Sequence, residues 1–340
     1  MPRLWSHWGG GLSGKELGNK WKEYDGSYQA NTEEEGIAEK SMAPQLADTF
    51  YNLVTDIYEW GYGQSFNLHP FIPGKGHTDA ARIFEEGLAD HLKLKPGMKV
   101  LDVGCGIGGP MRNIARYTQA NVVGITINQY QIDRANVLNK KSKLDHLCSL
   151  VQGDFLSMPF EDATFDAAYS IQATCHAPKL KDVYGQIFRV LKPGGLFVSS
   201  EWVTTPKYDR NNKDHVRIVN SICYSNALPE AHSYLGAEED AKAVGFEVVV
   251  NKDLELYAEN PWWTRIKMSR FTYVRNSILV SVFSALRIAP AEMKDVHRVL
   301  MEAIDSLIAG GELAIYTPIQ LIVLRKPLTS NAAAVESEAH

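Results

Sequence analysis

The sequence lacks the usual signs of a metal site, a membrane span or a polyanion partner. Its four cysteines form no C-x-x-C pair and no zinc-like spacing with histidine, so we predict reduced thiols and no metal. Acidic residues outnumber basic ones by 40 to 35, which disfavours nucleic acid as a partner. The uncharged apolar run over 276–286 is shorter than the about 20 residues that span a bilayer.

One stretch, Val100-Leu-Asp-Val-Gly-Cys-Gly-Ile-Gly-Gly109, carries the strongest positive signal. Its first residues have the pattern of a strand, and the glycines lead into a helix that begins near Pro110. A strand, a glycine-rich turn and a helix N-terminus together bring the backbone close to a nucleotide-like ligand. Glycine is needed because a Cβ would block that approach and because the turn uses positive φ.

The chain around this motif alternates between strands and helices. Strands are predicted over 99–104, 121–126, 148–152, 165–171 and 196–203. Helices are predicted over 43–60, 78–92, 110–117, 129–141 and 181–191. This alternation predicts an α/β fold with a parallel sheet, helices on both faces and ligands at the carboxyl ends of the strands.

The pattern loosens after residue 205 but still indicates secondary structure. Helices are expected over 211–224, 237–244, 261–286 and 290–309, and strands over 246–250 and 316–325. The last two strands would complete a seven-stranded sheet, with a helical insert between them.

A dinucleotide site must be considered, because Gly104, Gly106 and Gly109 satisfy G-x-G-x-x-G. Such a site needs a carboxylate at the end of the next strand. That strand ends in Ile127-Asn128-Gln129, which contains no acidic residue. NAD and FAD are therefore disfavoured.

The order of the remaining motifs favours another nucleotide. Asp102 precedes the glycines, Gly153-Asp154-Phe155 and Phe165-Asp166 follow, and Leu191-Lys-Pro-Gly-Gly195 leads into the fifth core strand. In this order the chain resembles the class I S-adenosylmethionine (SAM)-dependent methyltransferases. The resemblance implies a Rossmann-like, seven-stranded, mostly parallel sheet and S-adenosyl-L-methionine as the cofactor.

The same resemblance implies roles for individual residues. The glycine turn would lie along the methionine part and the ribose, Asn128 or Gln129 would reach the ribose hydroxyls, and Asp154 would meet the adenine amino group. A neutral amide binds a hydroxyl more weakly than a carboxylate does, and Asp154 alone also fits a turn or cap. The candidate cofactor-binding residues are Asp102, Gly104, Gly106, Asn128, Gln129, Asp154, Phe155 and Gln172.

Three further segments concern a substrate: Tyr58-Glu-Trp-Gly-Tyr-Gly-Gln-Ser-Phe66, Ile171-Gln-Ala-Thr-Cys-His-Ala-Pro178 and Ser200-Glu-Trp-Val-Thr204. By composition alone, the first also fits a structural turn whose rings dock into the core. Together the three resemble the sterol 24-C-methyltransferases over about residues 58–226, and again over 315–327. The resemblance implies methylation of an isolated alkene carbon through a carbocation.

This chemistry requires an aligned alkene, a stabilised cation, exclusion of water and removal of one proton. Aromatic faces stabilise a cation by about 0.5–2 kcal/mol each. The candidate catalytic residues are Tyr58, Trp60, Tyr62, His176 and Glu201, the last two for proton removal with Glu59 and Asp56 behind them. His176 also fits a buried structural histidine, and Glu201 also fits a hydroxyl ligand or a cap.

The candidate substrate-binding residues are Glu59, Phe66, Tyr169, Gln172, Cys175 and Trp202. The family usually has Glu where this chain has Gln172, and Gly-Asn/Asp-Gly-Leu-Pro where it has Ser225-Asn-Ala-Leu-Pro229. A neutral amide cannot offer a carboxylate to a sterol hydroxyl. The resemblance implies the sterol side chain at C-24 as the methylated group, with a triterpene such as squalene as the alternative. A methyltransferase for a polar small molecule and a non-catalytic SAM- or lipid-binding protein are the competing classes.

The expected organisation has four parts: an aromatic and helical lid (1–94), a SAM-binding core (95–205), a substrate region that completes the sheet (206–328) and a flexible tail (329–340). A lipid substrate implies an intracellular protein, cytoplasmic or peripheral on endoplasmic reticulum or lipid-body membranes. Pro261-Trp-Trp263 and the residues around Ile278 fit either a membrane-facing rim or the wall of an apolar pocket. The sequence leaves homo-oligomerisation open.

Overall fold

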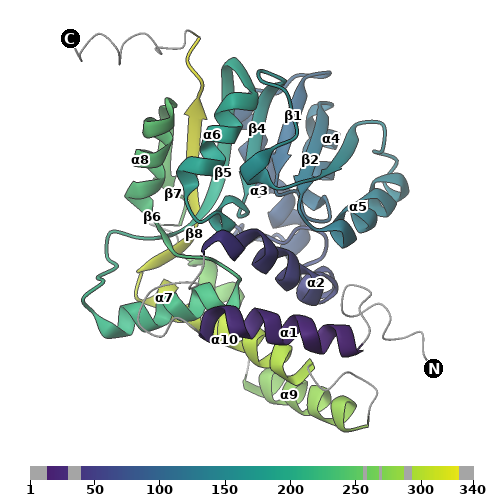
Figure 1. Cartoon of the computed structure of the whole chain (residues 1–340), viewed down its shortest axis with the longest axis vertical. Helices are drawn as coiled ribbons and strands as arrows, with labels where there is room; N and C mark the ends of the chain where they lie inside the picture. The colour runs from purple at the N-terminus through teal and green to yellow at the C-terminus, as the bar shows by residue number, and fades with distance from the viewer. Residues whose placement is uncertain (1–13, 30–39, 256–258, 268–269, 287–292, 329–340) are drawn as a thin grey trace.

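The computed structural model describes residues 14–29, 40–255, 259–267, 270–286 and 293–328 (Figure 1). The expected tail, 329–340, lies outside the described residues. The strands are β1 Lys99–Val103, β2 Asn121–Thr126, β3 Cys148–Gln152, β4 Phe165–Ile171, β5 Leu191–Thr204, β6 His232–Ser233, β7 Glu247–Asp253 and β8 Tyr316–Arg325.

The strands form one sheet in the order β3-β2-β1-β4-β5-β8-β7, with the two-residue β6 paired to β5. Strands β1 to β5 are mutually parallel, and β8 runs antiparallel between β5 and β7. The mostly parallel sheet predicted from the motif order is therefore confirmed. The strand order reverses between β1 and β4, which creates a crevice outside their carboxyl ends.

The longer helices are α1 Gly14–Gln29, α2 Ala43–Tyr62, α3 His77–Leu92, α4 Gly109–Thr118, α5 Gln129–Lys141, α6 Leu180–Val190, α7 Lys213–Ser225, α8 Tyr234–Val244, α9 Arg270–Ala285 and α10 Met293–Glu312. Short 3-10 turns are η1 Lys40–Met42, η2 Phe155–Ser157, η3 Thr174–His176 and η4 Trp262–Arg265. The predicted core elements agree with these bounds to within a few residues. Two differ: β5 begins at Leu191, and the helix expected over 261–286 consists of η4 followed by α9.

Two apolar cores lie against the sheet, one on each face. On one face, Val100 and Val122 pack with Leu88 of α3, Ile114 of α4 and Ile222 of α7. On the other face, side chains that alternate with these along the strands pack on α6 and α8. This two-sided burial explains why the central strands are almost continuously apolar.

A third core joins the two ends of the chain. Trp21 and Tyr24 of α1 and Phe50 of α2 pack with Val296 and Val299 of α10. Figure 1 shows α1, α2, α7, α9 and α10 together at one end of the sheet. Helix α1 was not expected from the sequence. It stands there because tertiary packing, more than its own helix propensity, stabilises it.

We call residues 40–76, which comprise η1, α2 and the segment that follows, the lid. Its helix is joined to α5 by three polar pairs: Asp48 Oδ1 with Asn128 Nδ2, Asp56 Oδ1 with the Tyr130 hydroxyl, and Glu59 with Arg134. We call these pairs the α2–α5 seam. They commit Glu59 and Asp56 to holding the lid, which removes both from the candidates for substrate contact and proton removal.

The segment after α2 is held against α3 and α4 at separate points. The amide of Asn67 donates to Glu85, a fully buried carboxylate that also accepts from Asn113. Burial raises the pKa of Glu85. Nearby, the backbone of Gln64 lies so close to Gly109 that a Cβ there would stand 1.9 Å from the Gln64 carbonyl oxygen.

Replacing Gly109 with alanine should therefore push the lid segment away and cost about 1–3 kcal/mol of stability, as overpacking does. Thermal unfolding would measure the loss. Gly185→Ala is the matched control, because an added Cβ in the middle of α6 meets no atom within 4 Å and should stabilise the helix by up to about 1 kcal/mol. Equal effects of the two substitutions would contradict this packing of the lid.

Candidate active site

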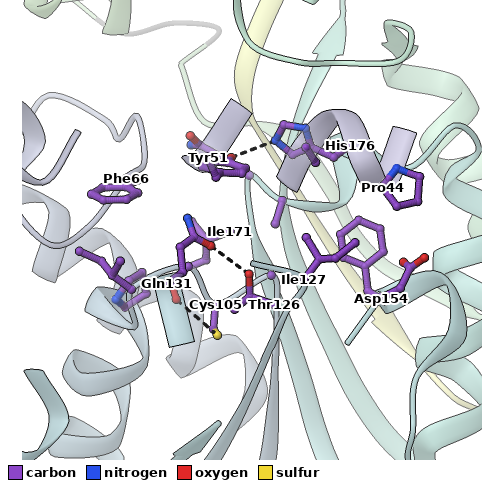
Figure 2. A pocket seen from close by; sticks show the side chains of 18 of the residues that line it. Pro44, Tyr51, Phe66, Cys105, Thr126, Ile127, Gln131, Asp154, Ile171 and His176 are labelled. Atoms are coloured by element: carbon purple, nitrogen blue, oxygen red, sulfur yellow. Dashed lines mark hydrogen bonds between the residues drawn. The ribbon is translucent and has the colours of Figure 1, made fainter. Parts of the chain in front are cut away.

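The first cavity lies outside the carboxyl ends of β1, β2 and β4 and is covered by α2 (Figure 2). Its empty volume is about 850 Å³, including the part open to solvent. It is lined by Ala43, Pro44, Ala47, Tyr51, Gln64, Phe66, Gly104, Cys105, Gly106, Ile107, Pro110, Thr126, Ile127, Gln131, Asp154, Phe155, Leu156, Ile171, Gln172, Ala173 and His176. We call it the cofactor cavity.

The glycine turn forms the floor of this cavity. Gly104 has φ +79°, and a Cβ there would stand 2.3 Å from the Cβ of Ala173. Gly106 has φ +53°, and an added Cβ would meet no protein atom within 4 Å. The first glycine therefore allows close packing, and the second leaves the space above the turn open.

A buried arginine fixes the turn against its surroundings. Arg112 donates to the carbonyl of Ile107 at 2.8 Å, to Asn139 at 3.0 Å and to Gln64 of the lid at 2.9 Å. Burial lowers the pKa of Arg112 to about 10. One side chain thus ties together the turn, α5 and the lid.

The opposite end of the cavity suits a flat aromatic ring with an amino group. Asp154 caps η2 by accepting from the Leu156 N–H at 2.8 Å through Oδ1, which leaves Oδ2 as an acceptor. The apolar side chains of Ile127, Phe155 and Leu156 line the same end. A carboxylate oxygen beside an apolar slot, together with the open turn at Gly106, fits the adenosyl and methionine parts of SAM.

Three predicted cofactor residues lie elsewhere. Asn128 is fully buried, caps α5 and donates its amide to Asp48 in the seam. Gln129 bonds Asp133 on the surface of α5. Neither amide enters the cavity wall, where Thr126 and Gln131 stand instead, bonded to each other at 2.9 Å.

Asp102, the third, is buried beneath the glycine turn. Its carboxyl accepts from the hydroxyl of Tyr169 at 2.9 Å, and burial raises the pKa of Asp102 to about 7. Neither Asp102 nor Tyr169 is among the residues that line the cofactor cavity. Asp102 and Tyr169 therefore form a buried pair that supports β1 and β4, and Tyr169 does not face a substrate.

The second cavity lies between the lid, η4 and α10. Its empty volume is about 1890 Å³, including the part open to solvent. It is lined by Ile57, Tyr58, Trp60, Gly61, Tyr62, Phe66, Asn67, Leu68, His69, His77, Gln172, Trp202, Asn226, Trp262, Arg265, Ile266, His297, Leu300, Met301, Ala303, Ile304 and Leu307. We call it the lipid chamber. It shares Phe66 and Gln172 with the cofactor cavity, so the two spaces meet at these residues.

The predicted aromatic cluster stands in the wall of the lipid chamber. The ring centroid of Tyr58 is 5.5 Å from that of Tyr62 and 5.6 Å from that of Phe66, both edge to face. The side chain of Trp60 is 73% exposed, so its ring is mostly in water. The half-buried rings of Tyr58, Tyr62 and Phe66 form the cluster, with Trp60 at its edge.

Gln172 has a structural task that the sequence did not suggest. Its Oε1 accepts from the Leu68 N–H at 2.8 Å, and its Nε2 donates to the Leu68 carbonyl at 2.5 Å. A carboxylate can only accept, so it could not make both bonds. The Gln at this position is explained by the backbone of the lid, without reference to the substrate.

The two candidates for proton removal occupy different environments. His176 lies in the wall of the cofactor cavity, and burial lowers its pKa to about 4, so the imidazole is neutral. Glu201 is fully buried outside both cavity walls, where one oxygen accepts from Thr174, Tyr184 and Ser199. Glu201 therefore supports the loop that carries His176 and does not reach a substrate.

Cys175 is also buried outside both cavity walls, 3.5 Å from the carbonyl oxygen of Gln172. Trp202 does line the lipid chamber. Its indole N–H has no hydrogen-bond partner in the described structure. Of the residues predicted to bind substrate, Phe66, Gln172 and Trp202 therefore face the chamber.

The chamber also has a polar row that the sequence reading missed. A guanidinium nitrogen of Arg265 lies 3.1 Å from Nδ1 of His69. Nε2 of His69 lies 3.1 Å from Nδ1 of His77, and Nε2 of His77 lies 3.1 Å from the carbonyl oxygen of Tyr62. Nδ1 of His69 also lies 3.1 Å from the carbonyl oxygen of Pro70, so this nitrogen faces a donor, Arg265, and an acceptor at once. Burial lowers the pKa of His69 to about 4, which agrees with neutral imidazoles.

Other residues that line the two cavities were not predicted, although the sequence contains a weak pattern for each group. Ala43, Ala47 and Tyr51 are spaced by four on α2, so two small residues and a tyrosine share the face that covers the cofactor cavity. His297, Leu300 and Ile304 recur at helical spacing on α10 and line the lipid chamber. The first pattern indicates close approach of a helix, but neither pattern names the ligand.

Two family profiles match the chain: "Methyltransferase domain" over residues 101–199 and "Sterol methyltransferase C-terminal" over residues 263–328. The 24-methylenesterol C-methyltransferase 2 of Arabidopsis thaliana is 52% identical, over 94% of this chain and 88% of that protein. Squalene methyltransferase 1 of Botryococcus braunii is 42% identical, over 96% and 88%.

A solved structure shares the fold. It is the geranyl diphosphate C-methyltransferase from Streptomyces coelicolor A3(2), in complex with Mg²⁺, geranyl diphosphate and S-adenosyl-L-homocysteine. The TM-score is 0.54 at 18% identity, and the match covers 76% of this chain and 88% of that one. The fold, the two profiles and the relatives identify a SAM-dependent methyltransferase, as the motif order predicted.

Gly106→Val should abolish SAM binding, because a β-branched side chain is strained at φ +53° and would fill the space above the turn. Isothermal titration would measure the affinity. Gly97→Val is the matched control, since Gly97 has φ +83° and equally open surroundings but lies at the amino end of β1. It should share the strain and retain SAM binding. Wild-type affinity in Gly106→Val would show that the cofactor lies elsewhere.

Proposed function

The chain belongs to the sterol methyltransferase family of SAM-dependent enzymes, and from this premise we propose that it methylates an isolated double bond of an isoprenoid lipid. The first substrate class is a sterol with a double bond at C-24 of its side chain. The alternative within the same family is a triterpene such as squalene. One observation carries the proposal: a cavity suited to SAM and a larger apolar chamber meet at Phe66 and Gln172.

We assign the cofactor contacts to residues of the cofactor cavity. Gly104 and Gly106 would pass along the methionine part and the ribose, and Asp154 would accept from the adenine amino group. Phe155 would pack on the adenine ring. Thr126 and Gln131, which line the cavity, would stand nearer to the ribose than Asn128 and Gln129, whose side chains bond elsewhere. Gln172, in the wall of both cavities, would border the reacting end.

When bound, SAM supplies an electrophilic methyl group on a sulfonium. The chain must then hold the alkene in line with that methyl group, about 3–3.5 Å away. Tyr58, Tyr62 and Phe66 present rings around the junction and would stabilise the cation by about 0.5–2 kcal/mol each. The lid that carries them covers the cofactor cavity and would exclude water, which would otherwise capture the cation.

A sterol is favoured over a hydrocarbon by the polar groups of the chamber. Arg265 uses one N–H for His69, and guanidinium has five donors. Trp202 adds an indole N–H without a partner in the described residues. Either group would bind a substrate hydroxyl, which squalene lacks. Gln172 does not argue for the hydrocarbon, because its amide is already bonded to Leu68.

Incubation of the purified protein with methyl-labelled SAM and a panel of lipids would test the proposal. The panel is zymosterol, cycloartenol, lanosterol, a 24-methylene sterol and squalene, with products identified by mass spectrometry. We expect label in at least one sterol and little in squalene. Label in squalene alone would establish the alternative, and label in none of the five would refute the proposed function.

Arg265→Ala should raise the KM for sterols, and this increase should be larger than any loss of affinity for SAM.

We further propose that the protein collects its lipid from a membrane surface through α9. Val274, Ile278, Val282 and Leu286 follow one another at intervals of four and are all exposed, so they form an apolar stripe. The helix contacts the chamber wall, where Ser277 lies 3.1 Å from His297. None of the described helices is long and apolar enough to span a bilayer. The stripe suits shallow insertion at the interface.

The double variant Ile278→Asp/Val282→Asp should reduce binding to phosphatidylcholine–sterol vesicles by about threefold or more, because two charges would enter the apolar face. Sedimentation with vesicles would measure the bound fraction. Val137→Asp on α5, another exposed apolar position, is the control and should bind as wild type. Unchanged binding of the double variant would rule out the stripe as the contact surface.

A further inference from the structure

Tyr51 and His176 form a hydrogen-bonded pair in the wall of the cofactor cavity. The Tyr51 hydroxyl lies 3.0 Å from Nε2 of His176, and the rings meet edge to face with centroids 5.5 Å apart (Figure 2). They come from the lid helix α2 and from η3, which follows β4. The packing of α2 on the core therefore brings the phenol to the imidazole.

The direction of the hydrogen bonds follows from the partners. Nδ1 of His176 is 2.9 Å from the carbonyl oxygen of Ala227. A carbonyl only accepts, so Nδ1 carries the hydrogen and Nε2 of the neutral ring has a free lone pair. The Tyr51 hydroxyl must then donate to Nε2. Its oxygen keeps lone pairs of its own, and the residue lines the cofactor cavity together with Phe66 and Gln172.

We propose that Tyr51 accepts the proton that the substrate cation loses, while its own hydroxyl proton passes to Nε2 of His176. The inference rests on the proposed function. A C–H bond next to the cationic carbon breaks, and its electron pair becomes the new double bond. The proton goes to the Tyr51 oxygen, the O–H bond of Tyr51 breaks toward His176, and the imidazolium releases its proton to water when the lid opens.

Other ionisable groups near the two cavities have another partner, another position or another proposed role, as Asp154 has toward the adenine amino group. Asp56 and Glu59 belong to the α2–α5 seam, and Glu201 lies outside both cavity walls. His69 and His77 use both nitrogens in the row that begins at Arg265. Among these groups, only the Tyr51–His176 pair combines a place in the cofactor cavity with an open acceptor.

A weak base suits this reaction better than a strong one. A carbocation loses a proton readily, so a neutral phenol oxygen backed by a buried imidazole of pKa about 4 is sufficient. A strong nucleophile beside an electrophilic methyl group would itself compete with the alkene for it. The hydrogen bond from Tyr51 occupies the lone pair of Nε2 and so protects the imidazole from methylation.

Tyr51→Phe keeps the ring and removes the acceptor. We expect total methyl label in lipid to fall by less than about fivefold, while the normal alkene product falls about tenfold or more. Alcohols from capture by water, or alkenes with the double bond elsewhere, should replace it. Gas chromatography with mass spectrometry would give the product ratio. SAM affinity and thermal stability, measured in parallel, would show that the variant is folded.

His176→Gln separates proton transfer from positioning. Glutamine can still accept the hydrogen bond of Tyr51, so a merely structural role would be rescued, but an amide cannot take up the proton. We expect the same shift in products as in Tyr51→Phe. Tyr117→Phe, which removes an exposed phenol bonded to Asp90 outside both cavities, is the control and should give the wild-type product.

A wild-type product ratio in both Tyr51→Phe and His176→Gln would overturn the inference while leaving the proposed function intact. A normal ratio in His176→Gln alone would also overturn the relay, because it would show that His176 only orients the phenol. If the wild-type protein methylates none of the lipids, the proposed function fails first. The two failures are therefore distinguishable in one experiment.

Discussion

The paired hydrogen bonds between Gln172 and the backbone of Leu68 determine how the lid meets the sheet. They resemble the pair of hydrogen bonds that joins two residues of neighbouring strands, but here a side chain at the carboxyl end of β4 makes both bonds. This pair of bonds holds the lid segment beside the crevice. It places Phe66, two residues before Leu68, at the junction of the cofactor cavity and the lipid chamber. It acts together with the hydrogen bonds from Arg112 to Gln64 and from Asn67 to Glu85, which hold the same segment.

Much of the SAM-binding core could be predicted because its signals are local. The alternation of strands and helices fixes a parallel sheet, and a parallel sheet brings the turns after its strands to one edge. For that reason Gly104, Gly106, Asp154 and Phe155 were predicted together and are found in one cavity. The aromatic string from Tyr58 to Phe66 was recognisable through its resemblance to the family signature, whereas its composition alone also fits a structural turn.

The rest depends on contacts between distant parts of the chain, which spacing cannot reveal. Asn128 has the right position for a ribose contact, but Asp48, 80 residues earlier, takes its amide. Tyr51 becomes conspicuous only when His176 is placed 3.0 Å away. Gln172 was read through its chemistry toward a substrate, whereas its partner is the backbone of the lid. A motif gives the position of a residue, but the folded neighbours decide which atoms of that residue remain available.

The α2–α5 seam has a consequence for the rate of turnover. Helix α2 covers the cofactor cavity and is fastened by Asp48, Asp56 and Glu59 to α5. The spent donor can pass α2 only after these pairs separate, and a fresh one can pass only before they form again. Opening motions of this kind occur in microseconds to milliseconds and set the pace of many enzymes. Ionic strength weakens partly exposed charge pairs such as Glu59–Arg134. It would therefore affect how long the cofactor stays bound beneath α2.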